Sequence, residues 1–345
     1  MTAAGTATAE PSSPTESKSL ENIETVCKKA SDCKKGNACV EGRCRKICEG
    51  DRNISTAAEF SAFAGEQCEV VSGHVIISKT DLQTLDGLGN LVQVGGLEIS
   101  ANAQLNDLDA LLHLTRIDGP LIVGRNGALS TLKGLENVRR IGGLIAVEFN
   151  PLLTDLAALR HIRHVDNDLL IRVNQSLSSL SDLREIASIT GTLILHSNDN
   201  GDLSGLAGLK TVGGDVTIVG SYALRSLNGL SSLEEIGGKL SIMNGSALND
   251  LNGLKNVTRL KGGILVTGTA VRTIRPLLGW PADAVTGPIV FYANSNLPKC
   301  EVTQFATAQI HPTAECPTNG LYTCMYNDGV NNCAPVPKAT PQNPK

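Results

Sequence analysis

The sequence predicts an all-β solenoid, a fold in which one short unit repeats along the chain and stacks on its neighbours. Three observations predict this fold: asparagine recurs at a fixed spacing, a pair of alternating aliphatic residues precedes each asparagine, and glycine or a glycine pair usually precedes the next strand. A repeat of roughly 20 to 50 residues is typical of solenoids. We therefore predict about ten coils of about 24 residues, with disulfide-bonded caps at both ends.

The asparagine spacing defines the repeat. Intervals of 24 residues separate Asn102, Asn126, Asn150, Asn174 and Asn198. The equivalent position is occupied at the start by Thr80 and later by Ser221, Gly245, Thr269 and Asn294. A buried amide at a coil corner can hydrogen bond both the backbone of its turn and the equivalent residue one coil away. We therefore predict a structural ladder formed by Asn102, Asn126, Asn150, Asn174, Asn198 and Asn294.

A strand precedes each ladder position and a return segment follows it. The aliphatic pair lies five and three positions before the asparagine, as in Leu97 and Ile99, and this alternation is the period of a β-strand. After the asparagine, aliphatic residues recur at steps of three, as in Leu129, Leu132 and Leu135. An α-helix would rotate such residues off one face, so the steps favour short flat or 3₁₀-like segments over four or five amphipathic helices.

The cysteines lie only at the two ends of the chain. They are Cys27, Cys33, Cys39, Cys44, Cys48, Cys68, Cys300, Cys316, Cys324 and Cys333. An even number without any C-x2-C pair predicts disulfides in an oxidising compartment rather than a zinc site. Because the ends of a solenoid expose apolar coils and unpaired strand edges, we expect disulfide-bonded caps there.

These features divide the chain into five regions. They are a disordered Ser/Thr/Pro-rich tether (1–25), a small disulfide module (26–47), the solenoid (48–299), a Cys-rich C-terminal cap (300–334) and a flexible Pro-rich tail (335–345). The N-terminus lacks the basic start and apolar stretch of a signal peptide, and no apolar run is long enough to span a membrane. We expect an extracellular or cell-surface protein of the outer envelope, tethered through its N-terminus as lipoproteins are.

The sequence offers little chemistry. The net charge of −4 argues against a nucleic-acid partner. His161 and His164 lack a third metal ligand, and no nucleophile motif is present. Glu98 and Glu148 are the candidate acid pair for glycoside hydrolysis, but they lie two coils apart, and the coil between them has no acid at this position. We therefore predict no enzyme activity, no cofactor and no metal.

The repeat L-x-I-x-x-N-x-x-L-x-x-L-x-G-L-x-x-L-x-x-I-G-G resembles the receptor L domain of insulin- and epidermal-growth-factor-type receptors. Residues 121–143 and 240–263 carry the motif best, and the similarity spans about residues 48 to 300, including the Cys48 and Cys68 pair before the first coil. The resemblance implies a right-handed β-helix, as in exported bacterial or fungal surface proteins. Ordinary leucine-rich repeats, with a helix or extended segment on the convex side, are the alternative fold. No kinase or furin-like region accompanies the motif, so receptor signalling is not implied.

The segment from Cys27 to Cys44 resembles a small two-disulfide module of exported proteins. The resemblance implies the pairs Cys27–Cys39 and Cys33–Cys44, whereas four cysteines alone allow three pairings. The module is basic, and we interpret this charge as a solvated surface in preference to an anion-binding patch.

The outward side of the strands is the candidate site. If the aliphatic pairs point inward, the residue between them points outward, and this residue is apolar from Ile122 to Ile194. An apolar stripe with a polar flank is typical of a contact surface. The predicted ligand-binding face consists of Ile122, Ala146, Glu148, Leu170, Arg172, Ile194 and His196.

In the receptors that the chain resembles, the corresponding broad sheet contributes to ligand binding. We therefore predict a non-catalytic recognition or adhesion protein that presents a rigid sheet face to a protein ligand. A glycan is less favoured because only 3% of residues are aromatic. Two alternatives stay open: a structural envelope spacer whose stripe is covered by its own terminal segments or reflects β-propensity alone, and a β-helix carbohydrate-binding or carbohydrate-active protein.

Overall fold

The computed structural model describes residues 26–198 and 200–309 of the 345-residue chain. The predicted tether (1–25) and tail (335–345), and the last three cysteines of the predicted C-terminal cap, lie outside the described residues; these cysteines are Cys316, Cys324 and Cys333. The chain divides into two compact units, Met1–Arg45 and Lys46–Lys345.

The first unit is a small disulfide-bonded module. A short 3₁₀ helix, η1 (Ala30–Asp32), precedes strand β1 (Asn37–Val40) and the start of β2 (Arg43–Cys48), which continues into the second unit. Its cysteines form the pairs Cys27–Cys39 and Cys33–Cys44, the pairing that the resemblance implies. Two covalent links in so short a segment replace the apolar core that it is too small to build.

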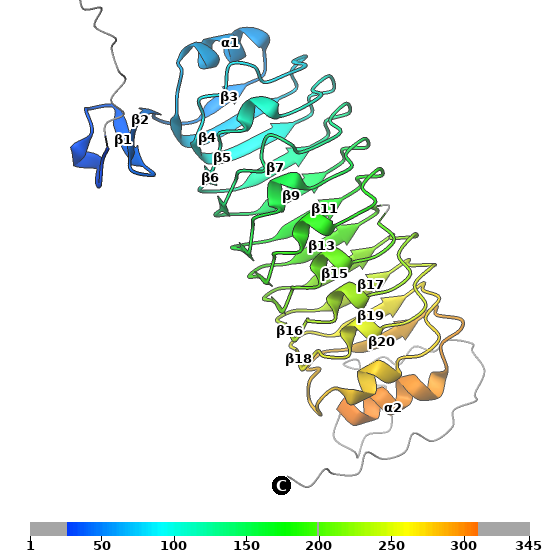
Figure 1. Cartoon of the computed structure of the whole chain (residues 1–345). Coiled ribbons are helices and arrows are strands. Elements are labelled where there is room, and N and C mark those ends of the chain that lie inside the picture. Colours follow the sequence, from blue (N-terminus) through cyan, green and yellow to red (C-terminus); the bar gives the residue numbers. More distant parts are fainter. Residues whose placement is uncertain (1–25, 199, 310–345) are drawn as a thin grey trace, which may run out of the picture. The chain divides into compact units, whose positions relative to one another are not determined.

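The second unit contains a long, mostly parallel sheet to which each repeat contributes one strand (Figure 1). In order along the sheet these strands are β4 (Val70–Ser78), β5 (Gln93–Ser100), β7 (Leu121–Gly124), β9 (Ile145–Glu148), β11 (Leu169–Arg172), β13 (Leu193–His196), β15 (Val216–Val219), β17 (Leu240–Met243), β19 (Ile264–Thr267) and β20 (Ile289–Tyr292). Equivalent residues of neighbouring repeats pair directly, as Leu121 pairs with Ile145 and Ile145 with Leu169. The prediction of a repeated, solenoid-like β fold is confirmed in this form.

The return segments contain 3₁₀ helices and very short strands. The 3₁₀ helices are η2 (Asp109–Leu111), η3 (Ala157–Leu159), η4 (Ser181–Leu183), η5 (Ser204–Leu206), η6 (Asn228–Leu230), η7 (Asn252–Leu254) and η8 (Arg275–Gly279). The two-residue strands are β6 (Arg116–Ile117), β8 (Arg140–Ile141), β10 (His164–Val165), β12 (Ser188–Ile189), β14 (Thr211–Val212), β16 (Glu235–Ile236) and β18 (Arg259–Leu260). The steps of three therefore correctly predicted 3₁₀-like returns.

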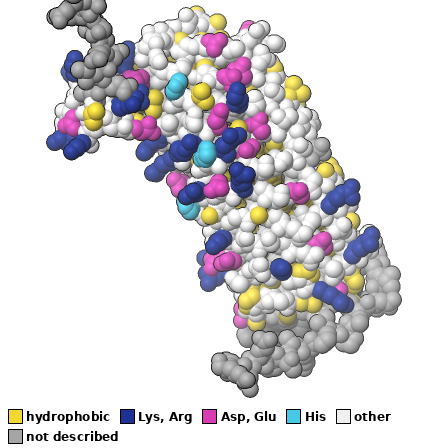
Figure 2. Space-filling model, in the orientation of Figure 1, with side chains coloured by type: hydrophobic (Ala, Val, Ile, Leu, Met, Phe, Trp, Pro, Cys, Tyr) yellow, Lys and Arg dark blue, Asp and Glu magenta, His cyan; other side chains and the backbone are white. Residues whose placement is uncertain are grey.

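The core is a continuous column of aliphatic side chains. In one coil Leu129, Leu132, Leu135 and Val138 are all fully buried, and the other coils repeat this arrangement. Figure 2 shows hydrophobic side chains only as scattered groups on the visible face. Apolar burial on this scale is the main source of stability for the coils.

The ladder asparagines lie in one buried column at the corner after each strand. The Oδ1 atom of Asn150 accepts hydrogen bonds from the backbone N (3.1 Å) and Nδ2 (3.2 Å) of Asn126. Asn150 Nδ2 donates to the Val123 carbonyl at 3.0 Å, and Asn150 N donates to Asn174 Oδ1 at 3.1 Å. The same pattern extends from Thr80 to Asn198 and is present again between Thr269 and Asn294.

The residue before each ladder position has a left-handed backbone conformation. In order along the chain these residues are Lys79, Ala101, Arg125, Phe149, Val173, Ser197, Gly220, Asn244, Gly268 and Ala293, with φ between 51° and 64°. The corner is thus one recurring turn whose left-handed conformation is unfavourable for most residues other than glycine.

The two ends of the described solenoid carry helices. At the N-terminal end, β3 (Arg52–Ile54) pairs with β4, and α1 (Ala57–Gly65) begins at a Thr56–Glu59 capping box. The Cys48–Cys68 disulfide closes this segment. At the C-terminal end, α2 (Lys299–Gln309) packs against η8, with Phe305 in edge-to-face contact with Trp280 and Phe291. Neither of these helices has the length and apolar character required to cross a bilayer.

Candidate functional site

Four neighbouring strands, β7, β9, β11 and β13, build the apolar part of the predicted face. Ile122, Ala146, Leu170 and Ile194 occupy equivalent positions and pair from one strand to the next. Their neighbours along each strand point into the core, so these four side chains form one outward column. Three of them are half-buried, whereas Ala146 is only 4% exposed because its methyl group lies between the longer side chains of Ile122 and Leu170. The surface of the apolar column is therefore recessed at Ala146.

The polar flank forms a second column beside the first. Glu148, Arg172 and His196 pair in register on β9, β11 and β13. Arg172 donates from Nε to Glu148 Oε2 at 2.8 Å, and its Nη2 donates to the same oxygen. The two charges are therefore already paired across the coils. Such a partly exposed pair contributes about 1 kcal/mol or less to stability, but it holds both side chains in fixed positions beside the apolar column.

Near the C-terminal end of the sheet, both outward columns contain apolar residues. Val219, Met243, Leu265, Val290 and Tyr292 lie on β15, β17, β19 and β20 in outward positions. The sequence-based face ended at His196 and missed this region. The signal was present in the alternation of the strands, because each of these residues lies one or three positions after an inward aliphatic residue.

Exposed aromatic residues at the corner next to the face were also missed. Phe149, 39% exposed, lies directly between Glu148 and the ladder residue Asn150, and the Arg125 guanidinium lies 5.2 Å from its ring centre. Tyr222, 64% exposed, follows the ladder position two coils beyond Asn174. A large aromatic residue at a corner otherwise occupied mostly by small or polar residues could have identified Phe149 from sequence.

An open groove follows this corner. Its volume is about 510 Å³, and its lining residues are Val173, Gln175, Ser197, Asn198, Gly220, Tyr222 and Ala223. Val173 and Ser197 occupy the same corner position as Phe149 in the next two coils. The face therefore has an edge with both an aromatic ring and a concave surface.

The face does not assemble paired acids for glycoside chemistry. The Glu148 carboxylate is paired with Arg172, and Glu98 accepts a hydrogen bond from Ser100 Oγ at 2.7 Å. Strand β7 lies between the strands that carry these two residues. Glu98 and Glu148 are therefore on strands that are not neighbours, and each carboxylate has its own partner.

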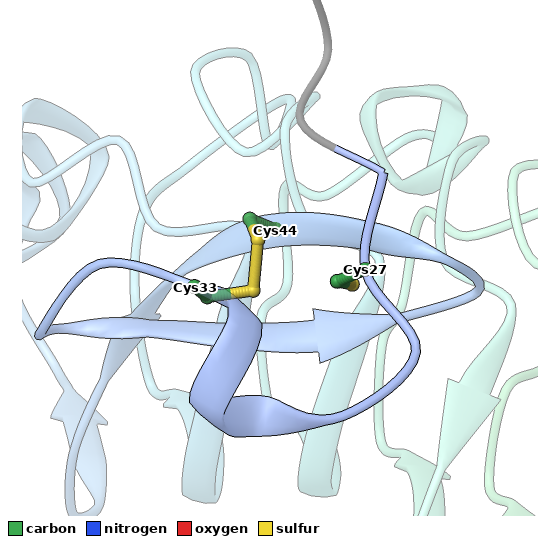
Figure 3. A group of neighbouring side chains, drawn as sticks. All are labelled: Cys27, Cys33 and Cys44. Atoms are coloured by element: carbon green, nitrogen blue, oxygen red, sulfur yellow. A yellow bond between two sulfur atoms is a disulfide. The ribbon is translucent and has the colours of Figure 1, made fainter.

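Two clusters of cysteines among the described residues have no thiol available for a metal ion. The sulfur atoms of Cys27, Cys33 and Cys44 lie within 4.8 Å of one another (Figure 3). All three belong to disulfides, and so do Cys48 and Cys68 near Glu66. Metal binding by cysteine requires thiolates, which disulfide sulfurs cannot supply.

Comparison of the chain with protein-family models and with curated proteins finds no match. Its function must therefore be inferred from the geometry of the sheet face and its edges.

Proposed function

We propose that this chain is a non-catalytic recognition protein that presents the sheet face around Leu170 to a protein ligand. The observation that carries the proposal is the unbroken outward column Ile122–Ala146–Leu170–Ile194, flanked by the fixed Glu148–Arg172 pair. Apolar patches with a polar rim are characteristic of protein interfaces. The resemblance to receptor L domains, whose broad sheet contributes to ligand binding, favours the same surface.

The rigidity of the face supports this function. Strands β7, β9, β11 and β13 each have a hydrogen-bonded strand on both sides, so the backbone is ordered before a ligand arrives. A preorganised surface loses little conformational entropy on association, and more of the contact energy then appears as affinity. The two α-helices among the described residues pack elsewhere, α1 against β3 and α2 against η8.

A protein ligand fits the side chains better than a glycan. Exposed Phe149 and Tyr222 lie at the corner and not in the middle of the face, so they form an edge and not a stacking platform for sugar rings. Aromatic residues and arginine at the border of an aliphatic patch are typical of protein–protein contacts.

The architecture we propose is a right-handed β-helix of the receptor-L-domain type, with disulfide-bonded caps at both ends. The 3₁₀ returns and the second sheet of two-residue strands support it over an ordinary leucine-rich repeat. Three disulfides suggest an oxidising environment. We propose that the protein is exported and held at the cell surface through its N-terminal segment, as a lipoprotein would be.

The substitution Leu170→Glu tests the proposed face. The full chain and the variant are used to capture ligands from the native envelope, and a captured protein is then titrated against both. We expect Leu170→Glu to abolish binding because it places a carboxylate in the apolar column. Its free energy of unfolding should change by no more than about 1 kcal/mol because the side chain points outward.

Ala207→Glu is the matched control. It adds the same charge on an exposed residue at the end of η5, away from the strand face, and should leave binding unchanged. A large loss of thermal stability in Leu170→Glu would show that Leu170 belongs to the core. Equal binding by both variants would contradict the proposed face and favour a spacer protein without a dedicated ligand.

A further inference from the structure

A second surface of the solenoid lies at the corner where the return segments meet the two-residue strands β8 and β10. A groove of about 400 Å³ is lined there mainly by Arg139, Arg140, His161, Arg163, His164 and Asp166. Lys and Arg side chains gather with His side chains in the upper half of the face shown in Figure 2. The volume is in the usual range of ligand pockets, roughly 300 to 1,000 Å³.

The groove has an excess of positive charge. Three guanidinium groups line it, against the single carboxylate of Asp166. Arg140 Nη2 lies 4.0 Å from Asp166 Oδ2, and Arg163 Nε lies 3.7 Å from Glu185 Oε2. Both ion pairs are therefore long and exposed. Arg139 donates to the Glu136 carbonyl, and within the described ranges no carboxylate pairs with it. The guanidinium donors are thus largely available to a ligand.

The fold itself does not require this charge. The position of Arg139 and Arg163 is occupied in other coils by Thr115, Ala187, Lys210, Glu234 and Thr258. The position of Arg140 and His164 is occupied by Arg116, Ser188, Thr211, Glu235 and Arg259. Because neutral and acidic residues fold equally well at this corner, the cationic cluster in two successive coils is a local feature and not a requirement of the repeat.

The two histidines complete a set of hydrogen-bond donors. His164 Nδ1 lies 2.8 Å from Ser188 Oγ, which orients its ring. Desolvation, followed by the charges of Arg139 and Arg160, lowers the pKa of His161, while Glu185 opposes this shift and Arg163 adds to it. The surrounding arginines would repel a metal cation, whereas an anion would relieve their mutual repulsion.

We infer that this groove binds a tetrahedral oxyanion, the phosphate or sulfate group of a ligand. Guanidinium groups present paired N–H donors that match the oxygens of such groups, and imidazole N–H groups can add further hydrogen bonds. This site is separate from the proposed sheet face and does not depend on it.

Titration of the full chain with two probes tests the site and identifies the source of the anion. The probes are inorganic phosphate and dextran sulfate, with uncharged dextran as the reference. Binding of both anions indicates a site for the free ion, and binding of dextran sulfate alone indicates a site for a group carried on a polymer. The double variant Arg139→Gln/Arg163→Gln should weaken binding by about tenfold or more, since each lost charge-assisted pair is worth about that factor.

Arg259→Gln is the control, because Arg259 occupies the corner position equivalent to Arg140, next to that of Arg139, but lies far along the solenoid. It should change the affinity less than about twofold, which is much less than the effect of losing one charge-assisted hydrogen bond. A separate readout is the NMR titration of His161 in the unsubstituted protein, whose pKa should rise when the anion binds. Equal weakening by the control, absence of binding, or an unchanged His161 titration would each overturn the inference.

Discussion

The coils of the asparagine ladder differ from the coils around Ser221 and Gly245, although both regions fold in the same way. Strands β15 and β17 pair in the same four-residue register as β9 and β11, and their return segments are equally well buried. Yet Ser221 Oγ has no hydrogen-bond partner within the described part of the chain, and Gly245 has no side chain to offer. The aliphatic pattern and the parallel pairing are therefore sufficient to form a coil.

The corner residues explain what the asparagines add. In the ladder region the left-handed residues include Arg125, Phe149 and Val173, for which this conformation is unfavourable by about 1–2 kcal/mol. Before Ser221 and Gly245, where the ladder is interrupted, the same corner is occupied by Gly220 and Asn244, which adopt this conformation readily. We infer that the ladder hydrogen bonds hold corners that would otherwise be strained, whereas corners without a ladder use residues that need no such support.

The largest effect should come from removing one ladder amide. We expect Asn150→Ala to lower the free energy of unfolding by about 3 kcal/mol, because a buried backbone N–H at Asn126 loses its acceptor. Urea denaturation monitored by circular dichroism measures the loss. Ser221→Ala is the control and should change stability by less than about 0.5 kcal/mol, because the hydroxyl it removes is unpaired. Similar losses in the two variants would contradict the comparison.

A smaller effect is expected when a strained corner is created outside the ladder. Gly220 has a φ of 61°, and a Cβ atom added there would lie 2.7 Å from Ser197 Oγ. Gly220→Val should therefore cost about 2 kcal/mol of unfolding free energy. Gly220→Asn should cost less, since asparagine tolerates this conformation, and equal costs would indicate that the added volume matters and not the backbone.

The smallest effect should be a gain. Val173 is a β-branched residue with a φ of 54°. Replacing it with glycine removes the backbone strain but increases the entropy of the unfolded chain, so Val173→Gly should stabilise the protein by about 0.5–1 kcal/mol. The same replacement in the strand, Val219→Gly, should instead destabilise by a similar amount. A loss of stability in both variants would show that the ladder corner is not strained.

Much of the fold follows from the spacing of a few residues. Asn102 to Asn198 occupy the predicted buried column, and the outward column from Ile122 to Ile194 lies on the strands expected of it. The left-handed corners could not be predicted, because valine and phenylalanine normally avoid that conformation. The basic groove was missed for a different reason. From sequence, His161 and His164 were considered only as metal ligands, whereas the repeat places Arg139 and Arg140 of the preceding coil at the same groove.

The direction of the ladder hydrogen bonds has a consequence for how such a molecule can change length. Each asparagine donates toward the next coil and accepts from the previous one, as Asn126 does to Asn150 and Asn150 does to Asn174. A duplication of 24 residues between two of these positions would separate one donor from its acceptor. The duplicated asparagine would then accept from that donor and donate to the original acceptor. The solenoid can therefore grow or shrink by whole turns in evolution, and its length can be adjusted without redesigning either end.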